Sequence, residues 1–182
     1  MSGVLVVYAS THGHTAKVAQ RIAEAVRRAG ADATVLDVEA AAEVDPTRDD
    51  AIVVGGSLHR GRHQRELAAW VKRHGEALAS RPSAFFSVSL TAADDTDEAR
   101  TATRRCIDEF VEDTGWTPQR SIAIAGALQY REYNIHTRVL MRLMMKRGGH
   151  PTDASHDYVY TDWDAVDRFG RECAALAAHS PV

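Results

Sequence analysis

The hydrophobic and polar positions of this chain follow two periods, one typical of buried strands and the other typical of amphipathic helices. Short apolar runs alternate with longer segments in which apolar side chains recur every three or four residues. Strands are predicted at Val4–Ala9, Ala33–Val38, Ala51–Val54, Ser83–Leu90 and Ile122–Leu128. Helices are predicted at Thr15–Ala29, Gln64–Ala79, Asp97–Thr114 and from Thr161 to about Ala178.

The alternation of strands and helices predicts the α/β class, with a parallel sheet covered by helices on both faces. Parallel connections are right-handed, and a doubly wound sheet of five strands is expected to take the order 2-1-3-4-5. No internal repeat or low-complexity linker interrupts the pattern. We therefore expect one domain over residues 1–182, with an insertion at about 129–150.

Ligands of such sheets lie at the carboxyl ends of the strands, where the strand order reverses. This rule selects the segments Ser10–Thr15, Gly55–Arg62 and Ser87–Ala93. In the second segment, glycines at both ends predict a flexible loop that carries Leu58 and His59 between them. The third segment offers hydroxyl groups on the opposite side of the predicted crevice.

The first segment has the composition of a phosphate-binding turn, because it joins a strand to a helix through hydroxyl residues and a glycine. The side-chain donors are Ser10, Thr11 and Thr15, and Gly13 allows close approach of the backbone. His12 and His14 would be neighbours of the bound anion. The segment contains no lysine or arginine and matches neither the P-loop nor the Rossmann pattern. A phosphate would therefore be held by amide and hydroxyl donors alone.

The run Val7-Tyr8-Ala9-Ser10-Thr11-His12-Gly13-His14-Thr15 resembles the flavodoxin signature, in which this loop surrounds the phosphate of FMN. The resemblance implies a flavodoxin-like fold, FMN as cofactor, and a flavin ring placed between the second and third segments. The expected cofactor-binding residues are Ser10, Thr11, His12, Gly13, His14, Thr15, Ser57, Leu58, His59, Arg60, Ser87, Val88, Ser89, Leu90 and Thr91.

The composition is that of a globular protein, with 45% hydrophobic and 26% charged residues among 182. The net charge of −3 gives no indication of nucleic-acid binding. Cys106 and Cys173 lack metal-ligand spacing, the histidines are scattered, and we expect two reduced thiols and no metal site. No apolar run approaches the roughly 18 residues of a membrane span, and no signal peptide is evident, so a cytoplasmic location is expected.

The insertion Gln129–His150 differs in charge from the rest of the chain, since it carries five basic side chains and one acidic side chain. Asn134–Arg147 has helical spacing, and three of the four methionines fall within it. Such a helix can lie on an anionic membrane or a partner helix, or it can pack on its own domain with its arginines in water. The pattern leaves both interpretations open.

Four further pieces resemble the quinone-dependent protoporphyrinogen IX dehydrogenases, a flavodoxin-like family of the heme pathway. They are Pro82-Ser83-Ala84-Phe85-Phe86-Ser87-Val88-Ser89-Leu90, Ile124-Ala125-Gly126-Ala127-Leu128-Gln129-Tyr130, Leu143-Met144-Met145-Lys146 and Tyr158-Val159-Tyr160-Thr161-Asp162-Trp163. The insertion also matches the family in place and character. The resemblance implies oxidation of protoporphyrinogen IX, with menaquinone as acceptor, by an enzyme peripheral to the cytoplasmic face of the inner membrane. His59, Arg60, Arg62 and Arg131 are candidate partners of the substrate propionates, and each can equally be a solvated surface charge. No catalytic acid or base stands out.

Two other functions stay open on the same fold. An electron-carrier flavodoxin would have no small-molecule substrate, but such carriers are strongly acidic near the flavin, whereas this chain has a mild charge and a basic insertion. An NAD(P)H:quinone reductase would use a nicotinamide donor instead. The sequence does not indicate an oligomeric state.

Overall fold

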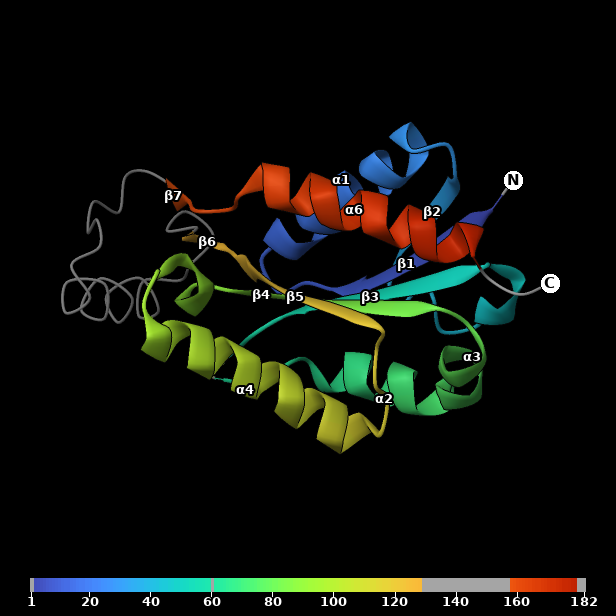
Figure 1. The fold of residues 1–182 in the computed structure, drawn as a ribbon. Helices are drawn as coiled ribbons and strands as arrows, with labels where there is room; N and C mark the ends of the chain where they lie inside the picture. The colour runs from blue at the N-terminus through green and yellow to red at the C-terminus, as the bar shows by residue number, and fades with distance from the viewer. Residues whose placement is uncertain (1, 60, 129–157, 180–182) are drawn as a thin grey trace.

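The computed structural model describes residues 2–59, 61–128 and 158–179, and it contains a central sheet with helices on both faces (Figure 1). The main strands are β1 (Gly3–Ala9), β2 (Asp32–Asp37), β3 (Ala51–Ser57), β4 (Ser83–Ser89) and β5 (Arg120–Ala125). All neighbours in this sheet are parallel and the order is β2-β1-β3-β4-β5, which confirms the predicted topology. The predicted insertion at 129–150 and Arg60 lie outside the described residues.

The helices form two layers, one on each side of the sheet (Figure 1). The upper layer in Figure 1 contains α1 (His14–Arg28) and α6 (Trp163–Ala178), and the lower layer contains α2 (Arg65–Arg73), α3 (Gly75–Ser80) and α4 (Asp97–Thr114). Short 3-10 turns occur at Pro46–Arg48 and Thr91–Ala93. In the described part of the chain, no helix has the length and apolar character needed to cross a membrane.

The central strands are apolar because both of their faces are covered. Val4 to Val7 of β1 and Ala51 to Val54 of β3 are almost completely buried, with alternate side chains entering the two cores. α1 and α6 approach each other closely at Gly170, where an added Cβ would lie 2.5 Å from the Cβ of Ala25. The two helices of the upper layer therefore pack tightly against each other, and their buried side chains share one core with those of β1 and β3.

Two predicted elements differ from the structure. The helix expected over Gln64–Ala79 is two helices, α2 and α3, which meet at His74, where the backbone leaves helical geometry (φ −101°, ψ 21°). The glycine that begins α3 has low helix propensity, so the chain bends there at small cost. The strand expected over Ile122–Leu128 leaves the main sheet at Gly126, and its last residues, β6 (Ala127–Leu128), pair antiparallel with β7 (Tyr158–Val159).

Gly55 and Gly56 were expected in a flexible loop, and this prediction is wrong. Both residues belong to β3, in register with Phe86 and Ser87 of β4. A Cβ on Gly55 would overlap the ring of Phe86, and a Cβ on Gly56 would lie 2.6 Å from Cδ2 of Leu67. These glycines therefore make room for the two cores, and the loop itself begins only after Ser57.

Candidate functional site

The predicted ligand-binding segments meet at one edge of the sheet, where the parallel strands β1, β3 and β4 end. We call this the carboxyl edge, and it lies at the left of the sheet in Figure 1. The backbone N–H of Leu58 donates to the carbonyl of Val88 over 2.8 Å, which joins the second segment to the third. The side chain of Gln64 joins the second segment to the first through Thr11 and Ala9. The crevice predicted from the strand order is therefore built from contacting segments.

The β1–α1 turn, residues 10–13, has the geometry of an anion-binding turn. Gly13 adopts a left-handed conformation (φ 81°) as the residue before α1, and its N–H donates to Oγ of Ser10 over 3.0 Å. No acidic side chain occupies the first turn of α1. Within the described ranges, the backbone N–H groups of His14, Thr15 and Ala16 have no acceptor. Free donors at a helix N-terminus attract an anion.

The residues of this turn differ in exposure, and His14 points into the protein. Thr11 is exposed, Ser10 and His12 are half-buried, and Thr15 is buried at the start of α1. His14 is buried, and its Nε2 lies 2.7 Å from Oγ1 of Thr161. Burial, with a smaller contribution from nearby Lys17, lowers the pKa of His14, so its ring is neutral near pH 7.

The contact between His14 and Thr161 has a defined direction. The hydroxyl of Thr161 donates its single hydrogen to the carbonyl of Ala125, 2.6 Å away, because a carbonyl can only accept. Nε2 of His14 therefore carries a hydrogen and donates it to Thr161. This chain of bonds ties the start of α1 to the end of β5 and to the segment that precedes α6.

The β3–α2 segment, residues 58–64, is shaped by a tight turn and by Gln64. His59 and Arg62 exchange backbone hydrogen bonds, and Gly61 adopts a left-handed conformation (φ 78°) between them. Nε2 of Gln64 lies 2.6 Å from Oγ of Ser57, 3.3 Å from Oγ1 of Thr11 and 3.3 Å from the carbonyl of Ala9.

The amide oxygen of Gln64 has no hydrogen-bond partner in the described part of the chain. It is fully buried, and among the described residues no donor reaches it. Leaving a buried acceptor unsatisfied costs about 1–3 kcal/mol. The unsatisfied amide oxygen lies where β1 and β3 end, and the amide nitrogen contacts residues of both strand ends. The hydrogen bonds donated by the amide nitrogen therefore offset the cost of the unpaired oxygen.

The third segment begins deeper in the sheet than the sequence suggested. Ser87, Val88 and Ser89 are buried in β4, and only Leu90 and Thr91 reach the carboxyl edge as half-buried and exposed residues. Oγ of Ser87 lies 2.9 Å from Nε2 of His63. Oγ of Ser89 accepts from the N–H of Ala92 over 3.2 Å and so shapes the turn that follows.

His63 is held in an aromatic cluster under the second segment. Its ring lies edge-on to Phe85 and Phe110, at centroid distances of 5.2 Å and 4.9 Å, and these two phenyl rings stack on each other. Burial lowers the pKa of His63 to about 4, so the ring is neutral near pH 7. The imidazole thus anchors the second segment to Ser87 and to the lower core.

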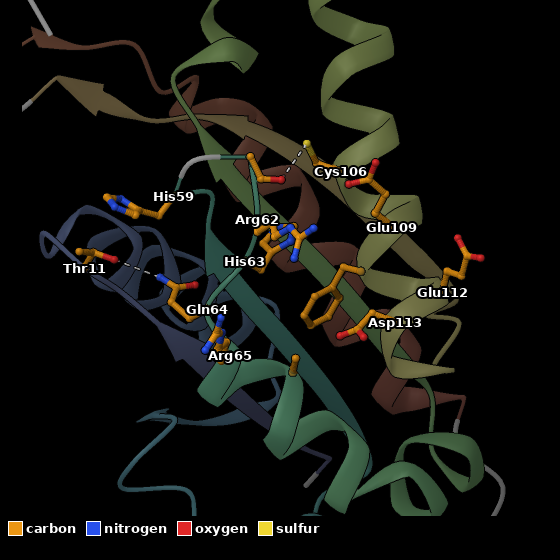
Figure 2. Close-up of a pocket in the computed structure, with 13 residues that line it drawn as sticks. Thr11, His59, Arg62, His63, Gln64, Arg65, Cys106, Glu109, Glu112 and Asp113 are labelled. Atoms are coloured by element: carbon orange, nitrogen blue, oxygen red, sulfur yellow. Dashed lines mark hydrogen bonds between the residues drawn. The ribbon is translucent and has the colours of Figure 1, made fainter. Parts of the chain in front are cut away.

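A cavity of about 790 Å³ extends from the β1–α1 turn to α4, and we call it the α2–α4 cavity (Figure 2). Figure 2 shows Thr11 and Gln64 at one end and the acidic residues of α4 at the other. Phe110 and Ala68 supply apolar lining, and Arg62 and Arg65 add two guanidinium groups. Its volume falls within the range of small-molecule sites.

Some charged side chains of the α2–α4 cavity form ion pairs with neighbouring residues and others do not. Glu109 pairs with Arg105 over 2.8 Å, and Asp113 pairs with Lys72 over 3.1 Å. Arg62 and Arg65 have no carboxylate partner within residues 2–59, 61–128 and 158–179. The two arginines are therefore available to an anionic ligand.

Some residues at this site were not singled out by the sequence, and others cannot be placed. His63, Gln64 and Arg65 were missed as site residues because they lie at or directly before the start of the helix predicted over Gln64–Ala79. The only signal that could have found them is this position, immediately before the first turn of the helix. Arg60 and Arg131 lie outside the described residues.

The sequence matches the family described as flavodoxin domain over residues 5–155. It is 35% identical over 173 residues to protoporphyrinogen IX dehydrogenase (quinone) of Escherichia coli strain K12, which covers 94% of each chain. The protein of the same name from Leishmania major is 35% identical over 182 residues, 97% of this chain and 77% of that one. A flavodoxin from the domain Archaea shares the fold, with a TM-score of 0.51 and 21% identity over 97% of this chain and 99% of that one.

Proposed function

The chain belongs to the flavodoxin domain family and, within it, to the quinone-dependent protoporphyrinogen IX dehydrogenases, and from this premise we propose its reaction. It oxidises protoporphyrinogen IX to protoporphyrin IX with FMN as its cofactor and a quinone as acceptor, a step of heme biosynthesis. The observation that carries the proposal is the 35% identity to the Escherichia coli enzyme over 94% of both chains.

The residues at the carboxyl edge fit FMN. The β1–α1 turn offers free N–H groups of α1 and hydroxyls of Ser10 and Thr11, and Ser57 adds a third hydroxyl beside them. These groups are all donors, as a phosphate requires, and the turn contains no carboxylate that would repel it. Leu58, His59, Arg60, Leu90 and Thr91 are the residues that we assign to the two sides of the flavin ring.

The chemistry of the step constrains what the protein supplies. Conversion of the porphyrinogen to the porphyrin releases six electrons and six protons, which reduce three quinones to quinols. FMN, when bound, supplies two-electron redox chemistry, while the protein provides position and electrostatics. Neutral His14 and His63 are already bonded to Thr161 and Ser87, so we assign them structural roles.

We assign the α2–α4 cavity to the tetrapyrrole. It opens beside Thr11 and Gln64, and therefore beside the proposed cofactor. Its apolar lining suits a pyrrole macrocycle, and guanidinium groups form paired hydrogen bonds with carboxylates. Arg62 and Arg65 are accordingly the proposed partners of the two substrate propionates, with His59 at the mouth of the cavity.

Menaquinone and the membrane surface complete the proposal. The basic, methionine-rich sequence within 129–150 supports approach to an anionic bilayer, in which the quinone is dissolved. The enzyme would then act as a peripheral protein on the cytoplasmic face of the inner membrane.

A steady-state assay under anaerobic conditions tests the function. Protein reconstituted with FMN is given protoporphyrinogen IX and menaquinone, and protoporphyrin IX is followed by its fluorescence. We expect porphyrin formation that requires both FMN and quinone. Quinone-dependent oxidation of NADPH without porphyrin formation would instead identify an NAD(P)H:quinone reductase. Flavin reduction only by a protein partner would identify an electron-carrier flavodoxin.

A further inference from the structure

Gln64 spans the carboxyl ends of β1 and β3 with one side-chain amide. Figure 2 shows it reaching Thr11 from the start of α2. The same nitrogen contacts Ser57, at 2.6 Å, and the carbonyl of Ala9, at 3.3 Å. The amide therefore contacts the two segments to which we assign the phosphate of FMN.

The carbonyl of Ala9 determines which way the amide faces. A carbonyl oxygen only accepts hydrogen bonds, so the atom that faces it must be the NH₂ group. In the flipped orientation, the amide oxygen would face the Ala9 carbonyl, and two acceptors would repel each other. The observed orientation leaves the amide oxygen buried without a donor among the described residues. The amide of Gln64 is therefore oriented so that its NH₂ group donates, while its oxygen accepts no hydrogen bond from the described residues.

This orientation controls the hydroxyl groups of Thr11 and Ser57. An amide nitrogen cannot accept, so both hydroxyl oxygens accept hydrogen bonds from Gln64, although the two amide hydrogens are shared among three acceptors. The hydroxyl hydrogens of Thr11 and Ser57 then have no acceptor in the described part of the chain. Ser10 is in the same state, since its oxygen accepts from the N–H of Gly13.

We propose that Gln64 is a positioning residue that holds Thr11 and Ser57 as hydrogen-bond donors toward the phosphate of FMN. The amide occupies the acceptor side of both oxygens, so that each hydroxyl hydrogen is directed at the anion. Because the β1–α1 turn contains no lysine or arginine, such donors carry much of the recognition of phosphate. The inference rests on the proposed function only in requiring that the cofactor be FMN.

The test compares FMN with riboflavin, which has the same ring system and no phosphate. Apoprotein is titrated with each ligand, and the dissociation constants are obtained from quenching of flavin fluorescence. Gln64→Glu has nearly the same shape, but its carboxylate accepts from both hydroxyls and turns them away from the ligand. Gln64→Met removes the donor without adding charge. Gln20→Glu, on an exposed position of α1, is the control for an added negative charge.

We expect Gln64→Glu to raise the dissociation constant of FMN at least tenfold and Gln64→Met to raise it about fivefold, while that of riboflavin changes less than twofold. Gln20→Glu should leave both constants unchanged. Equal weakening of FMN and riboflavin, or FMN affinity unchanged in Gln64→Met, would overturn the inference. The titration involves no turnover, so a wild type that binds FMN but does not oxidise protoporphyrinogen IX would refute the proposed function alone.

Discussion

The β1–α1 turn and the end of β3 both bring glycines to the carboxyl edge, but for different physical reasons. Gly13 has a left-handed backbone (φ 81°) and open space where a Cβ would lie, so it is needed for its conformation. Gly55 and Gly56 are ordinary strand residues with Phe86 and Leu67 where their Cβ atoms would be, so they are needed for their size. Gly13 shapes the β1–α1 turn, and Gly55 and Gly56 shape the core beneath it.

The difference separates what neighbouring residues determine from what distant residues determine. The conformation at Gly13 is dictated by its own strand–turn–helix sequence, in which Ser10 and the start of α1 lie within a few residues. The demand for small residues at 55 and 56 comes from Phe86 and Leu67, which meet them only after the sheet and α2 have assembled. Substitutions in the two regions should therefore destabilise the protein by different mechanisms, backbone strain at Gly13 and overpacking at Gly55 and Gly56.

Exchanging glycine for alanine in both regions should give the largest contrast. Gly55→Ala forces a methyl group into the ring of Phe86, and overpacking of this kind costs about 3 kcal/mol. Gly13→Ala adds a methyl group in open space and carries only the strain of a left-handed alanine, about 1 kcal/mol. Urea unfolding of the apoprotein measures both. Equal losses of stability would contradict the distinction drawn between the two glycines.

The pH dependence of the free energy of unfolding should report the burial of His63, which anchors the β3–α2 segment to the core. The pKa of His63 is about 4 in the folded protein and 6.5 when unfolded, so the unfolded state takes up the proton first as the pH falls. The contribution of His63 to the free energy of unfolding is therefore fully present above pH 6.5, is lost as the pH drops from 6.5 to 4, and changes little below pH 4. Between pH 7.5 and 4.5, His63 should account for about 2–3 kcal/mol of the loss.

His63→Phe keeps a ring beside Phe85 and Phe110 and removes the titrating group. Urea unfolding at the two pH values should show a pH dependence smaller by that amount, with a residual slope from His14, whose pKa is also lowered by burial. An unchanged pH dependence in His63→Phe would contradict the buried, neutral state assigned to His63.

The smallest expected effect separates the cofactor side of the site from the substrate side. Replacing both Arg62 and Arg65 by alanine should raise KM for protoporphyrinogen IX about tenfold, or about 1.4 kcal/mol, with little change in kcat or in FMN affinity. The dimethyl ester of the substrate, whose propionates carry no charge, should be oxidised equally by wild type and variant. Arg104→Ala, an exposed arginine of α4 away from the cavity lining, is the control. An equal rise in KM for the ester would exclude propionate recognition.

Much of the fold could be predicted because its signals are local. The apolar runs of β1, β3 and β4 reflect burial on both faces, and the glycine and hydroxyls after β1 reflect a turn that neighbouring residues complete. Gly55 and Gly56 were misinterpreted because their packing partners, Phe86 for Gly55 and Leu67 for Gly56, belong to other elements, β4 and α2. Gln64 was missed because it contacts Thr11 from 53 residues away, and no local pattern marks that meeting.

The proposed function depends on electron transfer from protoporphyrinogen IX to FMN in this site. The most direct measurement is an anaerobic stopped-flow experiment in which FMN-loaded protein is mixed with protoporphyrinogen IX in the absence of quinone. We predict that the visible absorbance of oxidised flavin bleaches while porphyrin absorbance rises, and that added menaquinone restores the flavin absorbance. Flavin that is bleached by dithionite but stays oxidised in the presence of protoporphyrinogen IX would contradict the function.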